Sequence, residues 1–191
     1  MRFGVNFDYL CPFARNVNEA VLNGLDQGRD WDVRFWAFSL AQVHVKDGDP
    51  DVWDAPEARS GVLALQWGVA ARDAFPELFP AVHRELFAAR HDHGRDIKDE
   101  SVIRHSVETA GADPDALAEV VATGVPLRTV ETEHTESVDR WRVFGVPTFL
   151  LDEHATFVRV MRRGDVEDLV RTLDMLSWTD LNEFKRTRVP R

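Results

Sequence analysis

The spacing of apolar residues over the first 38 positions constrains the fold more than any other feature of the sequence. Residues 2–8 form a short apolar run typical of a buried strand, and apolar side chains then recur at helical spacing over 11–27. Residues 32–38 are rich in aromatic and β-branched side chains, which predicts a second strand. Because two strands joined by a helix are normally parallel with a right-handed crossover, the segment predicts a β-α-β unit and an α/β fold.

The middle third of the chain has a different pattern. A loop rich in Gly, Asp and Pro is expected at 47–53, and residues 55–123 then show helical spacing without a convincing strand. We therefore expect one domain made of residues 1–54 and 124–191, interrupted by an all-helical insertion at 55–123. Since 44% of the residues are hydrophobic, the chain has enough apolar side chains for a packed core.

The last third returns to a mixture of helices and strands. A helix is expected over about 126–143, and another after Asp165, whose side chain is a suitable N-cap. Between them, residues 148–151 and 156–160 predict two short strands around a polar turn, which is typical of a hairpin. Together with the β-α-β unit, the hairpin predicts a central mixed sheet flanked by helices.

Charge and cysteine content exclude several classes of function. Acidic residues outnumber basic ones 33 to 23, for a net charge of -10, which argues against a nucleic-acid partner because phosphate binding needs clustered Lys and Arg. No run approaches the roughly 20 apolar residues that span a bilayer, so no membrane partner is expected. A chain with one cysteine forms no internal disulfide, which suits the reducing cytoplasm, where we expect this protein.

That single cysteine, Cys11, lies where the first predicted strand ends and the first predicted helix begins. The unpaired N–H groups and the positive end of the helix dipole favour the ionised, nucleophilic form of a thiol at this place. Pro12 supports the assignment, because proline suits the first helical turn. No His or Lys beside the sulfur adds a positive charge, so only moderate activation is expected. The alternative is a structural cysteine, which packs as a small buried hydrophobe.

The motifs around Cys11 also carry a family resemblance. The order of strand, Cys-Pro helix, strand, helical insertion, helix and hairpin closely resembles the thioredoxin fold with the helical insertion of the DsbA family. The resemblance rests on Phe7–Pro12 near the start, Gly94–Ile97 in the insertion and Gly145–Phe149 before the hairpin, and it covers nearly the whole chain. The closing segment Leu181–Arg188 is similar to the tail of a mycothiol-dependent reductase subgroup.

The resemblance implies a role for five residues. It implies that Cys11 is the catalytic residue of a thiol-disulfide oxidoreductase, and that Pro12 and Phe13 shape the surroundings of its sulfur. It also implies a cis peptide bond between Val146 and Pro147, placed against that sulfur so that an extended substrate can align there. A cis bond is tolerated essentially only before proline, which agrees with this interpretation. The alternative is that Pro147 merely begins a strand.

Ala14 departs from the family's dithiol motif, Cys-x-x-Cys. With two cysteines the second thiol resolves a mixed disulfide, whereas a monothiol depends on an external thiol such as mycothiol or glutathione as co-substrate. The resemblance therefore implies a monothiol oxidoreductase that acts through Cys11 on small-molecule or protein disulfides, with no tightly bound cofactor. Two alternatives stay open: a thiol-dependent isomerase or transferase, of the hydroxychromene-carboxylate isomerase or kappa-class glutathione transferase type, and a redox-inactive binding module on the same fold.

Other candidate sites are weaker. His91 and His93 point apart on a helix and no second cluster completes a metal shell, so we expect a solvated helix end and no metal site. The acidic run at 131–139 is interpreted as an exposed helix face, and Trp67 as a core residue or the lining of a substrate groove. Three roles stay open for residues 178–191: covering the groove, joining a homodimer interface or packing on the sheet.

Overall fold

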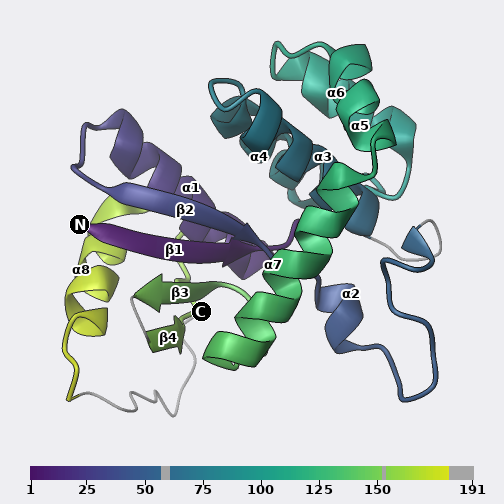
Figure 1. Cartoon of the computed structure of the whole chain (residues 1–191). Helices are drawn as coiled ribbons and strands as arrows, with labels where there is room; N and C mark the ends of the chain where they lie inside the picture. The colour runs from purple at the N-terminus through teal and green to yellow at the C-terminus, as the bar shows by residue number, and fades with distance from the viewer. Residues whose placement is uncertain (57–60, 152–153, 181–191) are drawn as a thin grey trace.

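The computed structural model describes residues 1–56, 61–151 and 154–180. Over these ranges it contains four strands and eight helices (Figure 1). In chain order they are β1 (Arg2–Phe7), α1 (Pro12–Asp26), β2 (Asp32–Ala37), α2 (Leu40–Val43), α3 (Val62–Ala74), α4 (Phe79–His91), α5 (Glu100–Thr109), α6 (Pro114–Ala122), α7 (Val125–Trp141), β3 (Thr148–Leu151), β4 (His154–Phe157) and α8 (Val166–Leu176). None of these helices is long and apolar enough to cross a membrane.

The four strands form one mixed sheet in the order β2-β1-β3-β4. β1 and β2 are parallel, with Phe3 opposite Val33, and α1 connects them, so the predicted β-α-β unit is confirmed. β3 is antiparallel to both β1 and β4, with Val5 opposite Phe149 in the first of these pairs. Every residue of β1 after Arg2 is buried, because this strand lies at the centre of the sheet. The turn that carries Cys11 therefore follows directly from the central strand.

The hairpin differs from the expected one in its second strand. β4 spans His154–Phe157, whereas the sequence pattern predicts 156–160. The register explains the difference, because the last residue of β4 already pairs with Thr148, the first residue of β3. The next residue, Val158, donates its N–H to the Pro147 carbonyl oxygen at 3.2 Å. The chain after β4 therefore runs beside the loop that precedes β3.

Helix boundaries follow the capping signals in the sequence. Cys11 and Asp165 are the N-caps of α1 and α8, and an Asp165 carboxylate oxygen accepts the Asp168 N–H at 2.8 Å. The short helix α2 has no counterpart in the sequence-based prediction, because four residues are too few to show a helical period. Its N-cap is Ser39, which accepts the Gln42 N–H at 3.2 Å.

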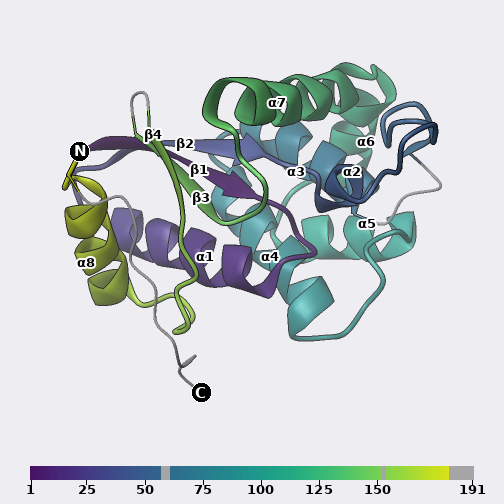
Figure 2. The same ribbon diagram turned by 90° about the horizontal axis from the view of Figure 1, so that it is seen from below.

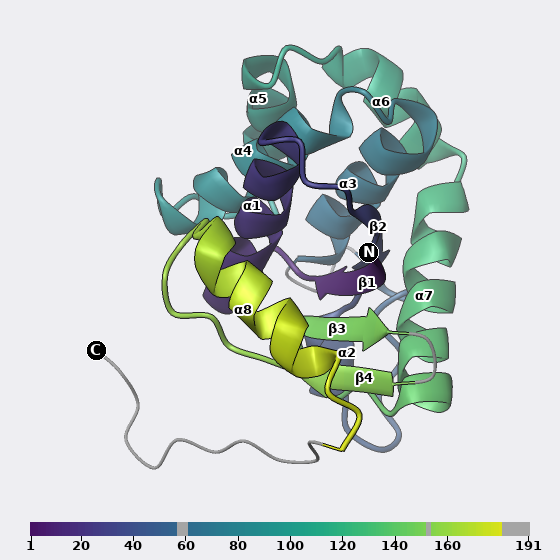
Figure 3. The same ribbon diagram turned by 90° about the vertical axis from the view of Figure 1, so that its left-hand side faces the viewer.

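Helices cover both faces of the sheet and one of its ends. In Figures 2 and 3, α1 and α8 lie on one face of the sheet and α7 lies on the other. The helices α3 to α6 gather beyond the end of the sheet at which β1 leads into α1 (Figures 1 and 2). Two helices of this group contact the helices that cover the sheet: α3 packs against α7, and α4 packs against α1. The helical segment between β2 and α7 therefore borders the turn that carries Cys11.

Candidate active site at Cys11

Cys11 is the N-cap of α1 and follows the turn that leaves β1. Its thiol donates to the Val146 carbonyl oxygen at 3.3 Å, and its sulfur accepts the Ala14 N–H at 3.4 Å. Pro12 occupies the first helical position, and Phe13 is partly buried. With 8% of its surface exposed, Cys11 is nearly buried but remains open to solvent.

The loop opposite Cys11 contains a cis peptide bond between Val146 and Pro147. Thr148 donates its hydroxyl to the Gly145 carbonyl oxygen at 2.7 Å, and the Val158 N–H donates to the Pro147 carbonyl oxygen. The loop is thus held by its own residues and by the segment after β4 while Val146 presents its carbonyl to the thiol. The structure brings together the five residues singled out from the sequence: Cys11, Pro12, Phe13, Val146 and Pro147.

Burial raises the pKa of the Cys11 thiol above its ordinary value. The N–H groups of Ala14 and Phe13 lower this pKa, whereas the Asp8 carboxylate raises it. The Arg159 guanidinium lowers the pKa of Cys11 as well. Burial is the largest of these influences, so on balance the pKa of the free thiol is raised. The N–H groups at the start of α1 act on the sulfur in the predicted direction, and burial opposes them.

A buried carboxylate, Asp8, supports the turn that carries Cys11. Its two oxygens accept the Leu10 N–H at 2.8 Å and the Leu40 N–H at 2.7 Å, so it joins this turn to the start of α2. The Asp8 carbonyl oxygen also accepts the Cys11 N–H at 3.0 Å. Burial raises the pKa of Asp8 to about 6, although both N–H donors lower it. Sequence reasoning missed this residue. The signal that could have found it is an acidic side chain directly after a buried strand.

Tyr9 joins the same turn to the helices around it. Its hydroxyl lies 2.8 Å from His83 Nδ1, and His83 Nε2 lies 3.1 Å from Asn18 Oδ1. The Asn18 amide nitrogen donates to the Ala14 carbonyl oxygen, so Asn18 Oδ1 accepts from Nε2–H and the Tyr9 hydroxyl donates to Nδ1. Burial lowers the pKa of His83 well below its ordinary value, in keeping with a neutral ring. The turn is thus fixed to α4 and α1 together.

Arg159 is a second residue that sequence reasoning missed. Its exposed guanidinium lies over the Phe13 ring, 5.2 Å from the ring centroid, and its charge lowers the pKa of Cys11. A single arginine after a short strand forms no motif. Its nearness to Cys11 depends on the path of the chain after β4, which the residue pattern did not predict correctly.

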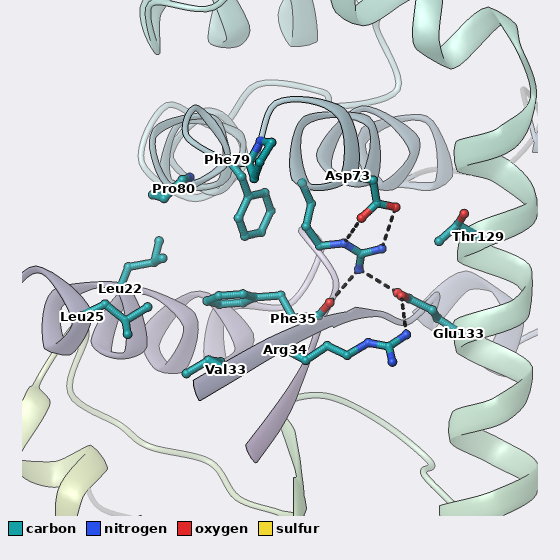
Figure 4. A pocket seen from close by; sticks show the side chains of 12 residues that line it. Leu22, Leu25, Val33, Arg34, Phe35, Asp73, Phe79, Pro80, Thr129 and Glu133 are labelled. Carbon is teal, nitrogen blue, oxygen red and sulfur yellow. Dashed lines mark hydrogen bonds and ion pairs between the residues drawn. The ribbon is translucent and has the colours of Figure 1, made fainter. Parts of the chain in front are cut away.

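A cavity of about 640 Å³ is separate from this site and lies between α1, β2, α3, α4 and α7 (Figure 4). On its polar side, Arg72 donates to Glu133 at 2.8 Å and to the Phe35 carbonyl oxygen at 2.6 Å. The Glu133 carboxylate also accepts the Ala37 N–H at the edge of the sheet, at 2.7 Å. Glu133 is buried, so the interpretation of 131–139 as an exposed acidic face is wrong at this position. The charges that line the cavity bind one another and hold α3 and α7 to β2.

The remaining sequence candidates lie elsewhere. His91 Nε2 is 2.9 Å from the Tyr9 carbonyl oxygen, and Trp67 is 1% exposed, so it packs in the core and lines no groove. No cluster of His, Cys, Asp and Glu suited to a metal ion occurs in the part of the chain that the structure describes. The segment Leu181–Arg188, which carries the subgroup resemblance, lies outside the described residues.

Several solved structures share this architecture at low sequence identity. The cytosolic disulfide reductase DsbM from Pseudomonas aeruginosa, solved with GSH, has a TM-score of 0.66 and 18% identity, and the match covers 93% of this chain and 99% of that one. A 2-hydroxychromene-2-carboxylate isomerase has a TM-score of 0.64 and 19% identity, with 93% and 96% covered. A probable DsbA oxidoreductase from Streptomyces coelicolor has a TM-score of 0.64 and 15% identity, with 97% and 93% covered. At these identities the likeness establishes the fold.

Sequence comparison establishes the family. No curated protein sequence matches the chain. The model of the DSBA-like thioredoxin domain matches residues 5–173, a range that begins in β1, ends in α8 and includes both Cys11 and Pro147. The protein therefore has a thioredoxin-like fold with a helical insertion and belongs to the family of DSBA-like thioredoxin domains.

Proposed function

We propose that this protein is a monothiol oxidoreductase, in which Cys11 exchanges with disulfides and an external small thiol completes the cycle. Membership of the family supports thiol-disulfide chemistry. The observation that carries the monothiol mechanism is the place of Ala14, whose N–H lies 3.4 Å from the Cys11 sulfur and whose methyl group stands where Cys-x-x-Cys motifs have their resolving thiol. Since the chain has no second cysteine, Cys11 has no internal partner.

The proposed reaction has two exchange steps. In the first, the Cys11 thiolate attacks one sulfur of a disulfide, the S–S bond breaks, a mixed disulfide with Cys11 forms, and the other sulfur leaves as a thiolate that takes up a proton. In the second, a glutathione or mycothiol thiolate attacks the substrate sulfur of the mixed disulfide and releases Cys11 as a thiolate. Each step exchanges one thiolate for another, so the reaction needs no separate electron acceptor.

The residues around the sulfur have distinct parts in this proposal. Pro12 and Phe13 shape the approach to Cys11, and Val146 and Pro147 align the substrate. The 3.3 Å contact between the Cys11 thiol and the Val146 carbonyl oxygen supports this assignment, because any group bonded to the sulfur lies beside that loop. We further propose that the protein acts in the cytoplasm, since its single cysteine suits a compartment whose thiols are kept reduced.

Reduction of a glutathionylated peptide tests this function. With glutathione or mycothiol present, we expect the wild-type protein to accelerate release of the peptide thiol and Cys11→Ser to show the uncatalysed rate. Because Cys11 is the only thiol in the chain, alkylation of the wild-type protein with iodoacetamide is a second way to remove it and should have the same effect. Acceleration that survives both treatments would refute the proposal.

A second candidate is a thiol-dependent isomerase or transferase, because the chain shares its fold with a 2-hydroxychromene-2-carboxylate isomerase. In that function the site at Cys11 would bind a reduced small thiol noncovalently. Calorimetry with reduced glutathione separates the two functions. Tight binding without a mixed disulfide in the mass spectrum, and without release of the peptide thiol, would favour the isomerase or transferase.

A further inference from the structure

A cation without a carboxylate partner lies beside Cys11. The exposed guanidinium of Arg159 is 5.2 Å from the centroid of the Phe13 ring and 5.3 Å from that of Phe157. Phe144, which is 68% exposed, packs on Phe157 with 5.2 Å between the ring centroids and extends the aromatic surface. Among the described residues, Arg159 forms no ion pair, so its charge is open to a ligand.

The two arginines that follow in the sequence show the contrast. Arg162 binds the Asp165 and Asp168 carboxylates, the first of them at 2.8 Å. Arg163 binds Glu19 and Asp92, at 2.8 Å for its closest contact with Asp92. Carboxylates of this chain neutralise both of these arginines. Arg159, which directly follows the residue that binds the Pro147 carbonyl oxygen, has no such partner among the described residues.

The backbone on each side of Arg159 is held in place without a ligand. Before it, the Val158 N–H donates to the Pro147 carbonyl oxygen at 3.2 Å. After it, the Asn16 amide on α1 donates to the Val160 and Met161 carbonyl oxygens, both at 3.1 Å. Arg159 is therefore fixed between the cis-proline loop and the helix that Cys11 caps, and little ordering of the backbone remains for a ligand to induce.

The chemistry of this arrangement selects a planar anion. A guanidinium whose neighbours are aromatic rings finds no hydrogen-bond acceptor in them, so its N–H donors remain free to match the two oxygens of a carboxylate. The rings also remove water from one face of the cation, which strengthens its attraction for an anion. Arg159 contacts Phe13, two residues from Cys11, and its positive charge lowers the pKa of the thiol.

We propose that Arg159, held against Phe13 and Phe157, binds a carboxylate of the small thiol or disulfide that reacts at Cys11. The inference rests on the proposed function and adds the substrate class: thiols and disulfides that carry a carboxylate are preferred to neutral ones. Glutathione carries carboxylates and mycothiol carries none, so the site discriminates in favour of glutathione-like partners.

Two disulfides that differ in charge but hardly in shape test the inference. Dithiodipropionate carries a carboxylate on each half, and dithiodipropionamide is its neutral amide. In both reactions the Cys11 thiolate attacks one sulfur, the S–S bond of the probe breaks, and one mercapto half leaves while the other stays on Cys11. The rate constant for each probe is measured from the mass of the mixed disulfide, and the result is the ratio of the carboxylate rate to the amide rate.

We expect Arg159→Gln to lower this ratio about fivefold, since an exposed Arg–carboxylate pair contributes about 1 kcal/mol. The ratio removes the effect of Arg159 on the Cys11 pKa, because a change in thiolate fraction alters both rates alike. Arg2→Gln is the matched control: it removes one positive charge at the opposite end of β1 from Cys11 and should leave the ratio as in the wild type.

Three outcomes overturn the inference, and they are distinguishable. An unchanged ratio in Arg159→Gln overturns it and leaves the proposed function standing. An equal fall in Arg2→Gln also overturns it, because the preference is then a long-range effect of net charge. A Cys11 that forms no adduct with either probe defeats the proposed function, and the inference falls with it.

Discussion

A single sulfur, that of Cys11, is subject to opposing influences. Burial raises its pKa more than the N–H groups of Phe13 and Ala14 lower it. The chain has no second thiol to attack a mixed disulfide at Cys11, so this adduct should persist until an external thiol attacks it.

Asp8 predicts a pH dependence of stability. Burial raises the pKa of Asp8 from 3.8 to about 6, so between these values the folded chain keeps a proton that the unfolded chain has released. Its contribution to the free energy of unfolding is thus greatest below about pH 4 and is lost as pH rises through about 6. At about 1.4 kcal/mol per unit of pKa, the loss is roughly 3 kcal/mol.

Asp8→Asn removes this titration and provides the comparison. The stability of the wild type relative to Asp8→Asn, measured by urea unfolding, should fall by roughly 3 kcal/mol between about pH 4 and pH 7. Other groups titrate in both proteins, so their contributions cancel in the difference. A difference that is the same at both pH values would show that Asp8 has no raised pKa in the folded protein.

At the scale of elements, the sequence predicts what depends on local pattern and misses what depends on distant packing. The apolar periods predicted β1, α1 and β2, and Asp165 marked the start of α8. By contrast, the end of β4 is set by where β3 begins, and this cannot be read from the residues of β4 themselves. Sequence reasoning missed Arg159 for the same reason, since its position depends on the path of the chain after β4.

Glu133 on α7 is buried, although the sequence pattern predicts an exposed helix face there. It lies among other acidic residues on α7, a pattern typical of a solvated helix face, yet Arg72 on α3 and the Ala37 N–H on β2 bury and bind it. The pairing of α7 with α3 at the edge of the sheet creates this environment. No pattern within α7 alone distinguishes Glu133 from the less buried acidic residues around it.

The junction of α3, α7 and β2 gives a second prediction. Glu133→Gln keeps the shape of the side chain but leaves Arg72 short of its buried carboxylate, and we expect the free energy of unfolding to fall by about 3 kcal/mol. Glu136→Gln, one turn further along α7, removes a partly exposed carboxylate 3.6 Å from Arg140 and should cost less than about 1 kcal/mol. Equal losses for the two variants in urea unfolding would contradict this account of the junction.

At the scale of the whole molecule, the site is assembled from segments far apart in the chain. Cys11 comes from the start of α1 and Val146 from the loop before β3, while Asp8 and Tyr9 tie the turn to α2 and α4. Sequence reasoning predicted Cys11, Pro12 and the Val146–Pro147 loop, because each belongs to a recognisable motif. It did not include the effect of burial on the thiol pKa, because the residues that bury the sulfur come from the assembled fold.

The fate of a mixed disulfide at Cys11 tests the monothiol mechanism most directly. Wild type and Ala14→Cys are each glutathionylated at Cys11, freed of excess reagent, and followed by mass without added thiol. The wild-type adduct should persist and disappear only when glutathione is supplied, whereas Ala14→Cys should expel glutathione unaided as it forms an internal disulfide. A wild-type adduct that is lost equally fast with and without added thiol would contradict the mechanism.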